Sequence, residues 1–200
     1  MTENIEFEVV SWEKTYGMLL KLAHKIRADG FKADLIVGIC RGGWLPARVL
    51  SDLLGIPHMA SVTVEFYSGV AERRKGKPRI TQPLAVHVKG KSVLIVDDVT
   101  DTGKSLRLAK SHLTKSGASQ IKLATLYHKP WSTITPDYYE KKTRRWVVFP
   151  WERRETVRNV IKKYRVKGRT LKEAREELTK SGLKCNLFDY LARESGEEKG

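Results

Sequence analysis

The stretch from Val93 to Leu106 constrains the fold more than any other part of this chain. It begins with four apolar residues (93–96), mostly β-branched, the composition of a strand that is buried on both faces of a parallel sheet. Two carboxylates, Asp97 and Asp98, follow where we expect this strand to end. Apolar residues at helical spacing from Leu106 onward then predict a helix. The stretch therefore predicts an α/β fold with a strand, a short loop and a helix in succession.

The loop between this strand and this helix has the composition of an anion-binding site. Backbone N–H groups at the start of a helix point at one spot, and the helix dipole favours negative charge there. Glycine lets the backbone approach a ligand closely, and hydroxyl and ammonium groups add donors. The loop residues that supply these features are Thr102, Gly103, Lys104 and Ser105. We therefore expect a phosphate to bind here, beside the carboxylates.

Two other interpretations of this loop explain less of it. A Walker A motif requires glycine at position 98, where this chain has Asp98, whose charge would repel the phosphates of a nucleotide. The aspartates could instead serve only as helix caps. Capping accounts for one aspartate and leaves the other two, together with the loop, unexplained.

The whole stretch resembles the phosphoribosyl pyrophosphate (PRPP) motif of type I phosphoribosyltransferases, in which an apolar strand and two acids precede Asp-Thr-Gly-x-Ser/Thr. The resemblance implies that Asp97 and Asp98 hold the ribose hydroxyls and help to place Mg²⁺, mostly through substrate and water. It implies that Asp101 is the catalytic residue, which handles the proton of the base near N7. The expected 5′-phosphate site consists of Asp101, Thr102, Gly103, Lys104 and Ser105.

A second strand, glycine-rich turn and helix lie earlier, over residues 35–54. Taken alone, Gly42-Gly43 could be an ordinary tight turn, but PRPP has two phosphate ends that need separate sites. The segment resembles the pyrophosphate loop of purine phosphoribosyltransferases. The resemblance implies a pyrophosphate site, with a cis peptide before the arginine, formed by Cys40, Arg41, Gly42 and Gly43.

A further resemblance concerns residues 128–152, which are similar to the nucleobase-binding region of 6-oxopurine phosphoribosyltransferases. There a lysine after a strand donates to O6 of the base, an aromatic ring stacks on the purine, and backbone groups read its edge. The matching residues are Lys129, Trp146 and Val147, with Glu152 near the pocket. Stacking contributes about 1–3 kcal/mol, although Trp146 could also be a core residue.

The same region, residues 128–152, contains two further tryptophans. For Trp131 and Trp151 we expect core packing rather than ligand contact. A helix over residues 11–29 is likewise expected to serve packing alone.

Two segments extend this organisation. Residues 67–79 are polar and basic, and they predict either a solvent-exposed hairpin tip or the flexible loop that, in the family, closes over PRPP. Residues 152–195 predict a three-helix extension, with Thr170 and Glu173 spaced as a capping box. We expect a phosphoribosyltransferase domain over residues 1–151 and a frayed tail over 196–200.

Charge and composition narrow the function classes. The formal net charge of +15 attracts polyanions, but basic residues are spread along the chain, so a nucleic-acid-binding arm is not expected. The two cysteines have no metal-ligand spacing and fit reduced thiols. No apolar run approaches the ~20 residues of a membrane helix, and the N-terminus lacks the features of a signal peptide. We therefore expect a cytoplasmic protein.

Together the resemblances imply an enzyme of purine salvage. It would join a purine base to PRPP with Mg²⁺ as cofactor, releasing pyrophosphate and a nucleoside monophosphate, and the family suggests a homodimer. Lys129 favours a 6-oxopurine, whereas the helical tail resembles an adenine-using archaeal branch, and on that resemblance we expect adenine. The alternatives are a 6-oxopurine enzyme (hypoxanthine, guanine or xanthine) and, in another class, an RNA-binding regulator that senses PRPP or nucleotides.

Overall fold

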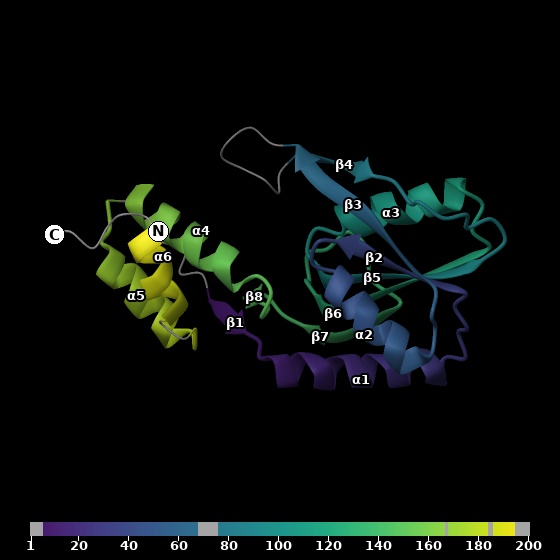
Figure 1. The fold of residues 1–200 in the computed structure, drawn as a ribbon, viewed down its shortest axis with the longest axis horizontal. Helices are drawn as coiled ribbons and strands as arrows, with labels where there is room; N and C mark the ends of the chain where they lie inside the picture. Colours follow the sequence, from purple (N-terminus) through teal and green to yellow (C-terminus); the bar gives the residue numbers. More distant parts are fainter. Residues whose placement is uncertain (1–5, 68–75, 167, 184–185, 195–200) are drawn as a thin grey trace. The chain divides into compact units, whose positions relative to one another are not determined.

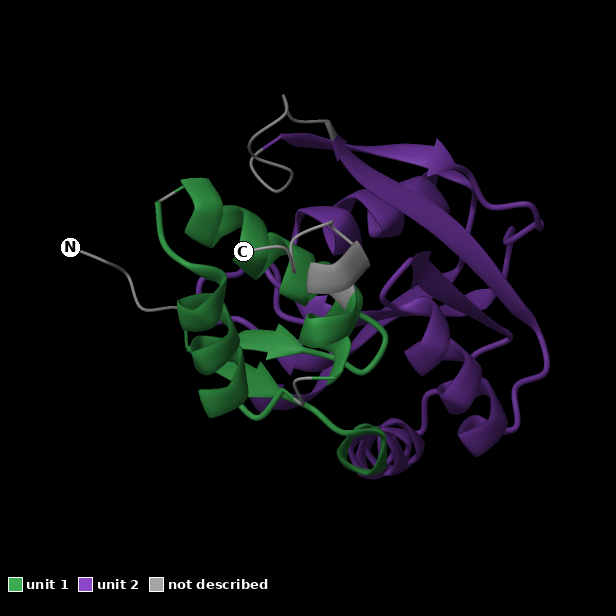
Figure 2. Cartoon of the chain, turned by 60° about the vertical axis from the view of Figure 1, so that its left-hand side comes forward, with its two compact units in different colours: residues 1–15, 145–200 green, residues 16–144 purple. Residues whose placement is uncertain are grey.

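The computed structural model describes residues 6–67, 76–166, 168–183 and 186–194. The chain forms two compact units, one of residues 1–15 with 145–200 and one of residues 16–144, drawn in green and purple in Figure 2. Each unit has its own apolar core. The expected phosphate loops belong to the second unit, which is described first.

The unit of residues 16–144 is built on a six-stranded sheet with the strand order β4-β3-β2-β5-β6-β7 (Figure 1). Every neighbouring pair is parallel except β3 and β4. The strands are β2 (Leu35–Cys40), β3 (Met59–Tyr67), β4 (Lys77–Gln82), β5 (Ser92–Thr100), β6 (Gln120–His128) and β7 (Tyr138–Lys142). The central mainly parallel sheet, flanked by helices, confirms the predicted fold class.

Three helices accompany this sheet: α1 (Trp12–Ala28), α2 (Trp44–Leu54) and α3 (Lys104–Lys115). The division between the units falls within α1, which begins after Ser11, whose Oγ accepts from the N–H of Lys14 at 3.1 Å. Lys25 of α1 donates from Nζ to the backbone oxygen of Tyr139 on β7 at 2.9 Å. The helix predicted over 11–29 is therefore present, and it buries Leu19, Leu22 and Ile26, whereas Trp12 and Tyr16 are about half exposed.

One face of β5 packs against α3, because successive side chains of a strand point to opposite sides and Val93 and Ile95 therefore share a face. Val93 and Ile95 belong to one core cluster with Leu106 and Leu113 of α3. Large buried side chains at such positions cost about 2–5 kcal/mol when cut back to alanine. This packing fixes the start of α3 against the end of β5.

The strand β5 is longer than expected. The sequence places its end before Asp97, whereas β5 runs to Thr100. Its pairing with β6 continues through Val99 opposite Tyr127 and Thr100 opposite His128. Backbone pairing and two β-branched residues therefore extend the strand past the acids, and Asp97 and Asp98 lie on opposite faces of the sheet.

The two ends of the segment expected as a loop over residues 67–79 lie in strands. Its ends belong to the antiparallel pair of β3 and β4, in which Tyr67 lies opposite Lys77 and Glu65 opposite Arg79. Residues 68–75, where the expected loop is centred, lie outside the described residues.

The other unit combines a two-stranded parallel sheet with the helices of the C-terminus. Strand β1 (Phe7–Val9), which the sequence did not predict, pairs with β8 (Trp146–Val148). The helices are α4 (Arg153–Val166), α5 (Leu171–Lys180) and α6 (Asn186–Glu194). The three predicted helices are thus present, and the capping box between Thr170 and Glu173 is formed in both directions.

The core of this unit joins β8 to the C-terminal helices. Val148 is fully buried with Val160, Ile161 and Leu178, and Phe7 packs against the same cluster. By contacts, β1 and β8 therefore group with the helical extension, whereas the expected division was at residues 151 and 152. The family-based domain ranges stay a prediction. None of the helices in the described residues is long and apolar enough to cross a membrane.

Candidate functional site

The two predicted phosphate loops lie at adjoining strand ends. Strands β2 and β5 pair in parallel, with Gly38 opposite Val96, so the turn after β2 meets the end of β5. A side chain at Gly42 would overlap the carboxylate of Asp98, and one at Gly43 would lie 2.8 Å from the Cα of Asp97. The structure therefore brings the expected pyrophosphate loop directly against the expected ribose-binding acids.

The turn after β2 has the backbone that the resemblance implies. The peptide bond between Cys40 and Arg41 is cis. The N–H of Gly43 donates to the carbonyl of Ile39 at 2.8 Å, and α2 begins at the next residue, Trp44. Arg41 is exposed, so its guanidinium lies at the surface of this loop.

The two acids of β5 have different surroundings. Asp98 is only 4% exposed and faces Gly42, on the side of the sheet away from α3, whereas Asp97 is half-buried. The N–H of Asp98 donates to Oδ1 of Asp97 at 3.0 Å. Because successive side chains of a strand alternate, the two carboxylates leave the backbone on opposite faces, and their assignment to ribose stays a prediction.

The loop that precedes α3 is held from behind by residues 132–134. Gly103 has φ +80°, and a side chain there would lie 2.5 Å from Cγ2 of Ile134 and 2.7 Å from Oγ of Ser132. The N–H and Oγ1 of Thr133 both donate to the carbonyl of Thr102, at 3.2 and 2.9 Å. The loop is thus fixed before any anion binds, and its donors stand at the N-terminus of α3.

Lys129 is placed beside the acid loop by the pairing of β5 with β6. Thr100 lies opposite His128, and the N–H of Lys129 donates to the carbonyl of Thr100 at 2.9 Å. Lys129 is only 6% exposed, whereas lysines are rarely buried unless their charge is paired. Burial, and then the charge of Lys142, lower the pKa of the neighbouring His128.

Trp131 occupies a position that the sequence did not predict. Its side chain is 50% exposed, so the expectation of core packing was wrong. The indole Nε1–H donates to Oδ1 of Asp101 at 2.9 Å, and Nζ of Lys129 lies 5.4 Å from the centroid of its rings. Nothing in the composition of this segment distinguishes such a tryptophan from a buried one, because the contact depends on β5 and β6 being neighbours.

The remaining predicted base-binding residues belong to the other compact unit. Trp146 and Val147 lie on β8, and Glu152 accepts from the N–H of Thr156 at the start of α4 at 3.0 Å. Trp146 is half-buried against the core of that unit, and Val147 is buried. Trp151 stacks on Phe149 with 4.8 Å between ring centroids, as expected of a packing residue. The roles of Trp146, Val147 and Glu152 toward a base stay predictions.

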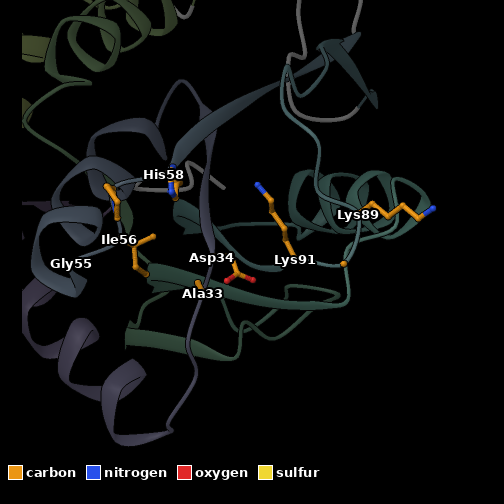
Figure 3. A pocket seen from close by; sticks show the side chains of 9 residues that line it. Ala33, Asp34, Gly55, Ile56, His58, Lys89 and Lys91 are labelled. Atoms are coloured by element: carbon orange, nitrogen blue, oxygen red, sulfur yellow. The ribbon is translucent and has the colours of Figure 1, made fainter.

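A pocket in the unit of residues 16–144 lies at the other end of the strands (Figure 3). It is formed by residues that precede β2, β3 and β5, and those labelled in Figure 3 include Asp34, His58 and Lys91. Asp34 accepts the N–H of Ser92 at 2.8 Å through Oδ2. The phosphate loops follow the carboxyl ends of β2 and β5, so this pocket is not part of the predicted site.

The family model of the phosphoribosyl transferase domain matches residues 9–155. A xanthine-guanine phosphoribosyltransferase of Gluconobacter oxydans is 30% identical over 152 residues, which are 75% of this chain and 87% of that protein. A second one, of Idiomarina loihiensis, is 29% identical and covers 74% of this chain and 88% of its own length. The solved structure of a purine phosphoribosyltransferase from Pyrococcus horikoshii has a TM-score of 0.66 and 41% identity, covering 74% of this chain and 95% of that one.

These matches coincide with the geometry. The matched range contains both phosphate loops, Lys129 and β8, and it ends within α4, so the helices that follow are not covered by it. That the extension is of an archaeal type therefore stays a prediction. The chain belongs to the phosphoribosyltransferase family, as a type I purine phosphoribosyltransferase.

Proposed function

We propose that this enzyme transfers the phosphoribosyl group of PRPP to a 6-oxopurine, with guanine, xanthine or hypoxanthine as the base. The observation that carries the proposal is the buried ammonium of Lys129 next to the Asp101 loop. The expected preference for adenine has no support among the compared relatives, two of which are named xanthine-guanine phosphoribosyltransferases.

The chemistry of the 6-position favours an oxopurine. Lysine has three donors and no acceptor, so its ammonium can donate to a 6-oxo oxygen, whereas the 6-amino group of adenine is itself a donor. A buried charged donor that faces another donor costs about 1–3 kcal/mol or more. Since Lys129 is 6% exposed, water offers it little compensation. This difference corresponds to roughly 10- to 100-fold in selectivity.

The proposed reaction breaks the bond between C1′ of PRPP and the pyrophosphate oxygen and forms a bond from C1′ to a purine ring nitrogen. Positive charge develops at C1′ as pyrophosphate leaves, as in glycoside hydrolysis. The turn of residues 40–43 would hold the pyrophosphate, and the donors before α3 would hold the 5′-phosphate. Asp101 would accept the proton that the base loses, which is the work of a general base.

The residues of the site are compatible with magnesium bound mainly through the substrate. No cluster of three metal-ligating side chains occurs in the described parts of the chain, and the nearby donors are the carboxylates of Asp97 and Asp98. Mg²⁺ prefers oxygen ligands and retains several waters, so one or two carboxylates with PRPP oxygens suffice. When bound, the metal neutralises charge on the departing pyrophosphate.

Steady-state kinetics with each base test the choice of base. Guanine, xanthine, hypoxanthine and adenine are offered separately with Mg²⁺ and PRPP, and kcat/KM is compared. We expect at least one 6-oxopurine to exceed adenine by more than tenfold, and Lys129→Met to reduce that ratio. A matched control is Lys122→Met, which removes a half-buried lysine that pairs with Asp137 instead. An advantage for adenine in the wild-type enzyme would refute the proposal.

The same assay separates an enzyme from a regulator. If none of the four bases is turned over while RNA binding persists at high salt, the regulatory alternative applies, because non-specific phosphate contacts weaken steeply with salt. The homodimer stays a prediction, which sedimentation equilibrium would test.

A further inference from the structure

Trp131 connects the two side chains on which the proposed chemistry depends. The edge of its indole reaches Asp101, with 2.9 Å between Nε1 and Oδ1, and its rings lie 5.4 Å from Nζ of Lys129. Asp101 comes from the loop after β5, whereas Lys129 and Trp131 follow β6. One rigid side chain thus contacts the group assigned to the proton of the base and the group assigned to its 6-position.

We propose that Trp131 is a positioning residue. Its indole N–H fixes the direction of the Asp101 carboxylate, and its rings hold the Lys129 ammonium at a set distance above their face. This inference rests on the proposed function for the roles of Asp101 and Lys129, but the contact itself is independent of it. An indole has one donor and two side-chain torsions, so it holds a carboxylate with little conformational freedom. A cation over the face of an indole is attracted by the ring quadrupole.

The segment that carries Trp131 is rigid enough for this task. The N–H of Ser132 donates to the carbonyl of Lys129 at 3.0 Å, which closes a tight turn around Pro130. Thr133, two residues after Trp131, donates from its N–H and from Oγ1 to the carbonyl of Thr102 in the phosphate loop, and Lys129, two residues before Trp131, donates from its N–H to the carbonyl of Thr100. Trp131 therefore sits on a turn that is fastened at both sides to the loop it is proposed to support.

The exposure of Trp131 argues against a purely structural role. Half of the side chain is accessible, and a surface tryptophan contributes little to a core. The substitution Trp131→Phe removes the donor and keeps a ring below Lys129. We expect it to leave PRPP affinity unchanged and to change the melting temperature by only a few degrees, while kcat falls about 10- to 100-fold because the Asp101 carboxylate loses its fixed orientation toward the base.

A double-mutant cycle distinguishes positioning from an unrelated effect. If Trp131 acts through Asp101, Trp131→Phe has no further effect on kcat once Asp101→Asn is present. Trp12→Phe, which removes another exposed tryptophan that contacts Trp151, is the matched control and should leave kcat unchanged. Equal losses from Trp131→Phe in both backgrounds would overturn the proposal.

A spectroscopic measurement tests the contact without turnover, so that a failure here differs from a failure of the proposed function. The five tryptophans give five indole N–H resonances, and the one missing in Trp131→Phe identifies Trp131. Hydrogen bonding to a carboxylate deshields the indole proton. We therefore expect Asp101→Ala to move this resonance upfield and leave the other four in place. An unchanged resonance would refute the inference even in a fully active enzyme.

Discussion

The contact between Gly42 and Asp98 makes a sharp prediction about how the two phosphate loops depend on each other. In Gly42→Ala, the new methyl group would occupy the space of the Asp98 carboxylate. The overlapping atoms belong to one side chain, so the backbone can stay and the carboxylate must move. Because Asp98 is 4% exposed, it has no open solvent to move into without disturbing its neighbours.

The expected loss follows from what Asp98 is proposed to hold. A hydrogen bond to a charged group contributes about 1.5–3 kcal/mol, so displacing this carboxylate should weaken PRPP binding by roughly 10- to 100-fold. Overpacking costs about 1–3 kcal/mol in stability, and the lower end applies because a side chain rather than backbone yields. For a chain of this size, that lowers the melting temperature by about 2–4 °C.

Isothermal titration with Mg²⁺ and PRPP, together with calorimetric melting, measures both effects. The matched controls are two other glycines. Gly17→Ala meets nothing within 4 Å and lies in α1, so binding should be unchanged and stability should rise by up to about 1 kcal/mol. Gly43→Ala would overlap backbone atoms, so it should destabilise the fold more than Gly42→Ala does. Normal PRPP affinity in folded Gly42→Ala would refute the reasoning.

Three further predictions concern the proton transfer assigned to Asp101, the loop before α3, and the loss of folding stability at low pH. Asp101→Asn should retain PRPP binding and lower turnover by about 10²–10⁴, and near-normal turnover in steady-state assays would leave it only a loop-shaping role. Gly103→Ala, at φ +80° and against Ile134, should weaken binding of phosphate-bearing ligands more than Gly30→Ala, which is also at positive φ but meets nothing within 4 Å. Burial lowers the pKa of His128 below 6.5, so the unfolded chain binds more protons and stability falls as the pH drops below about 6.5. In denaturant unfolding of His128→Phe between pH 7 and 4, the free energy of unfolding should fall less steeply with decreasing pH than in the wild type. An unchanged slope of stability against pH would assign the loss to other groups.

The central sheet could be predicted from sequence because its strands are buried apolar runs. Strands β2, β5 and β6 consist mainly of residues that are apolar and fully covered, and helices cover a parallel sheet on both faces. Each predicted phosphate loop could be located from the glycine-containing turn between an apolar strand and a helix, whereas the adjacency of the two loops became visible only from the pairing of β2 with β5. The capping box at Thr170 could be predicted because it depends only on two residues three positions apart in the sequence.

The missed elements depend on partners that are remote in sequence. Strand β1 has three residues, and its pairing of Phe7 with Trp146 cannot be read from either segment alone. Strand β7 (Tyr138–Lys142) is a sheet edge with charged residues, so it lacks the composition of a buried strand. The continuation of β5 past Asp97 was missed because acids are depleted in strands, and only the pairing with β6 keeps them there.

The pairing of β5 with β6 also determines where Asp101 and Lys129 lie relative to each other. Thr100 lies opposite His128 at the ends of β5 and β6, so Asp101 and Lys129 are the residues that directly follow these two paired strands. A one-residue shift of register would send Lys129 to the other face of the sheet. The carbonyl of Thr100 prevents this by accepting the N–H of Lys129 itself, and Trp131 adds a side-chain contact across the same gap. The relative placement of Asp101 and Lys129, the proposed proton acceptor and the proposed donor to the base, therefore depends on the pairing of β5 with β6, and the exposed Trp131 adds a hydrogen bond that orients Asp101.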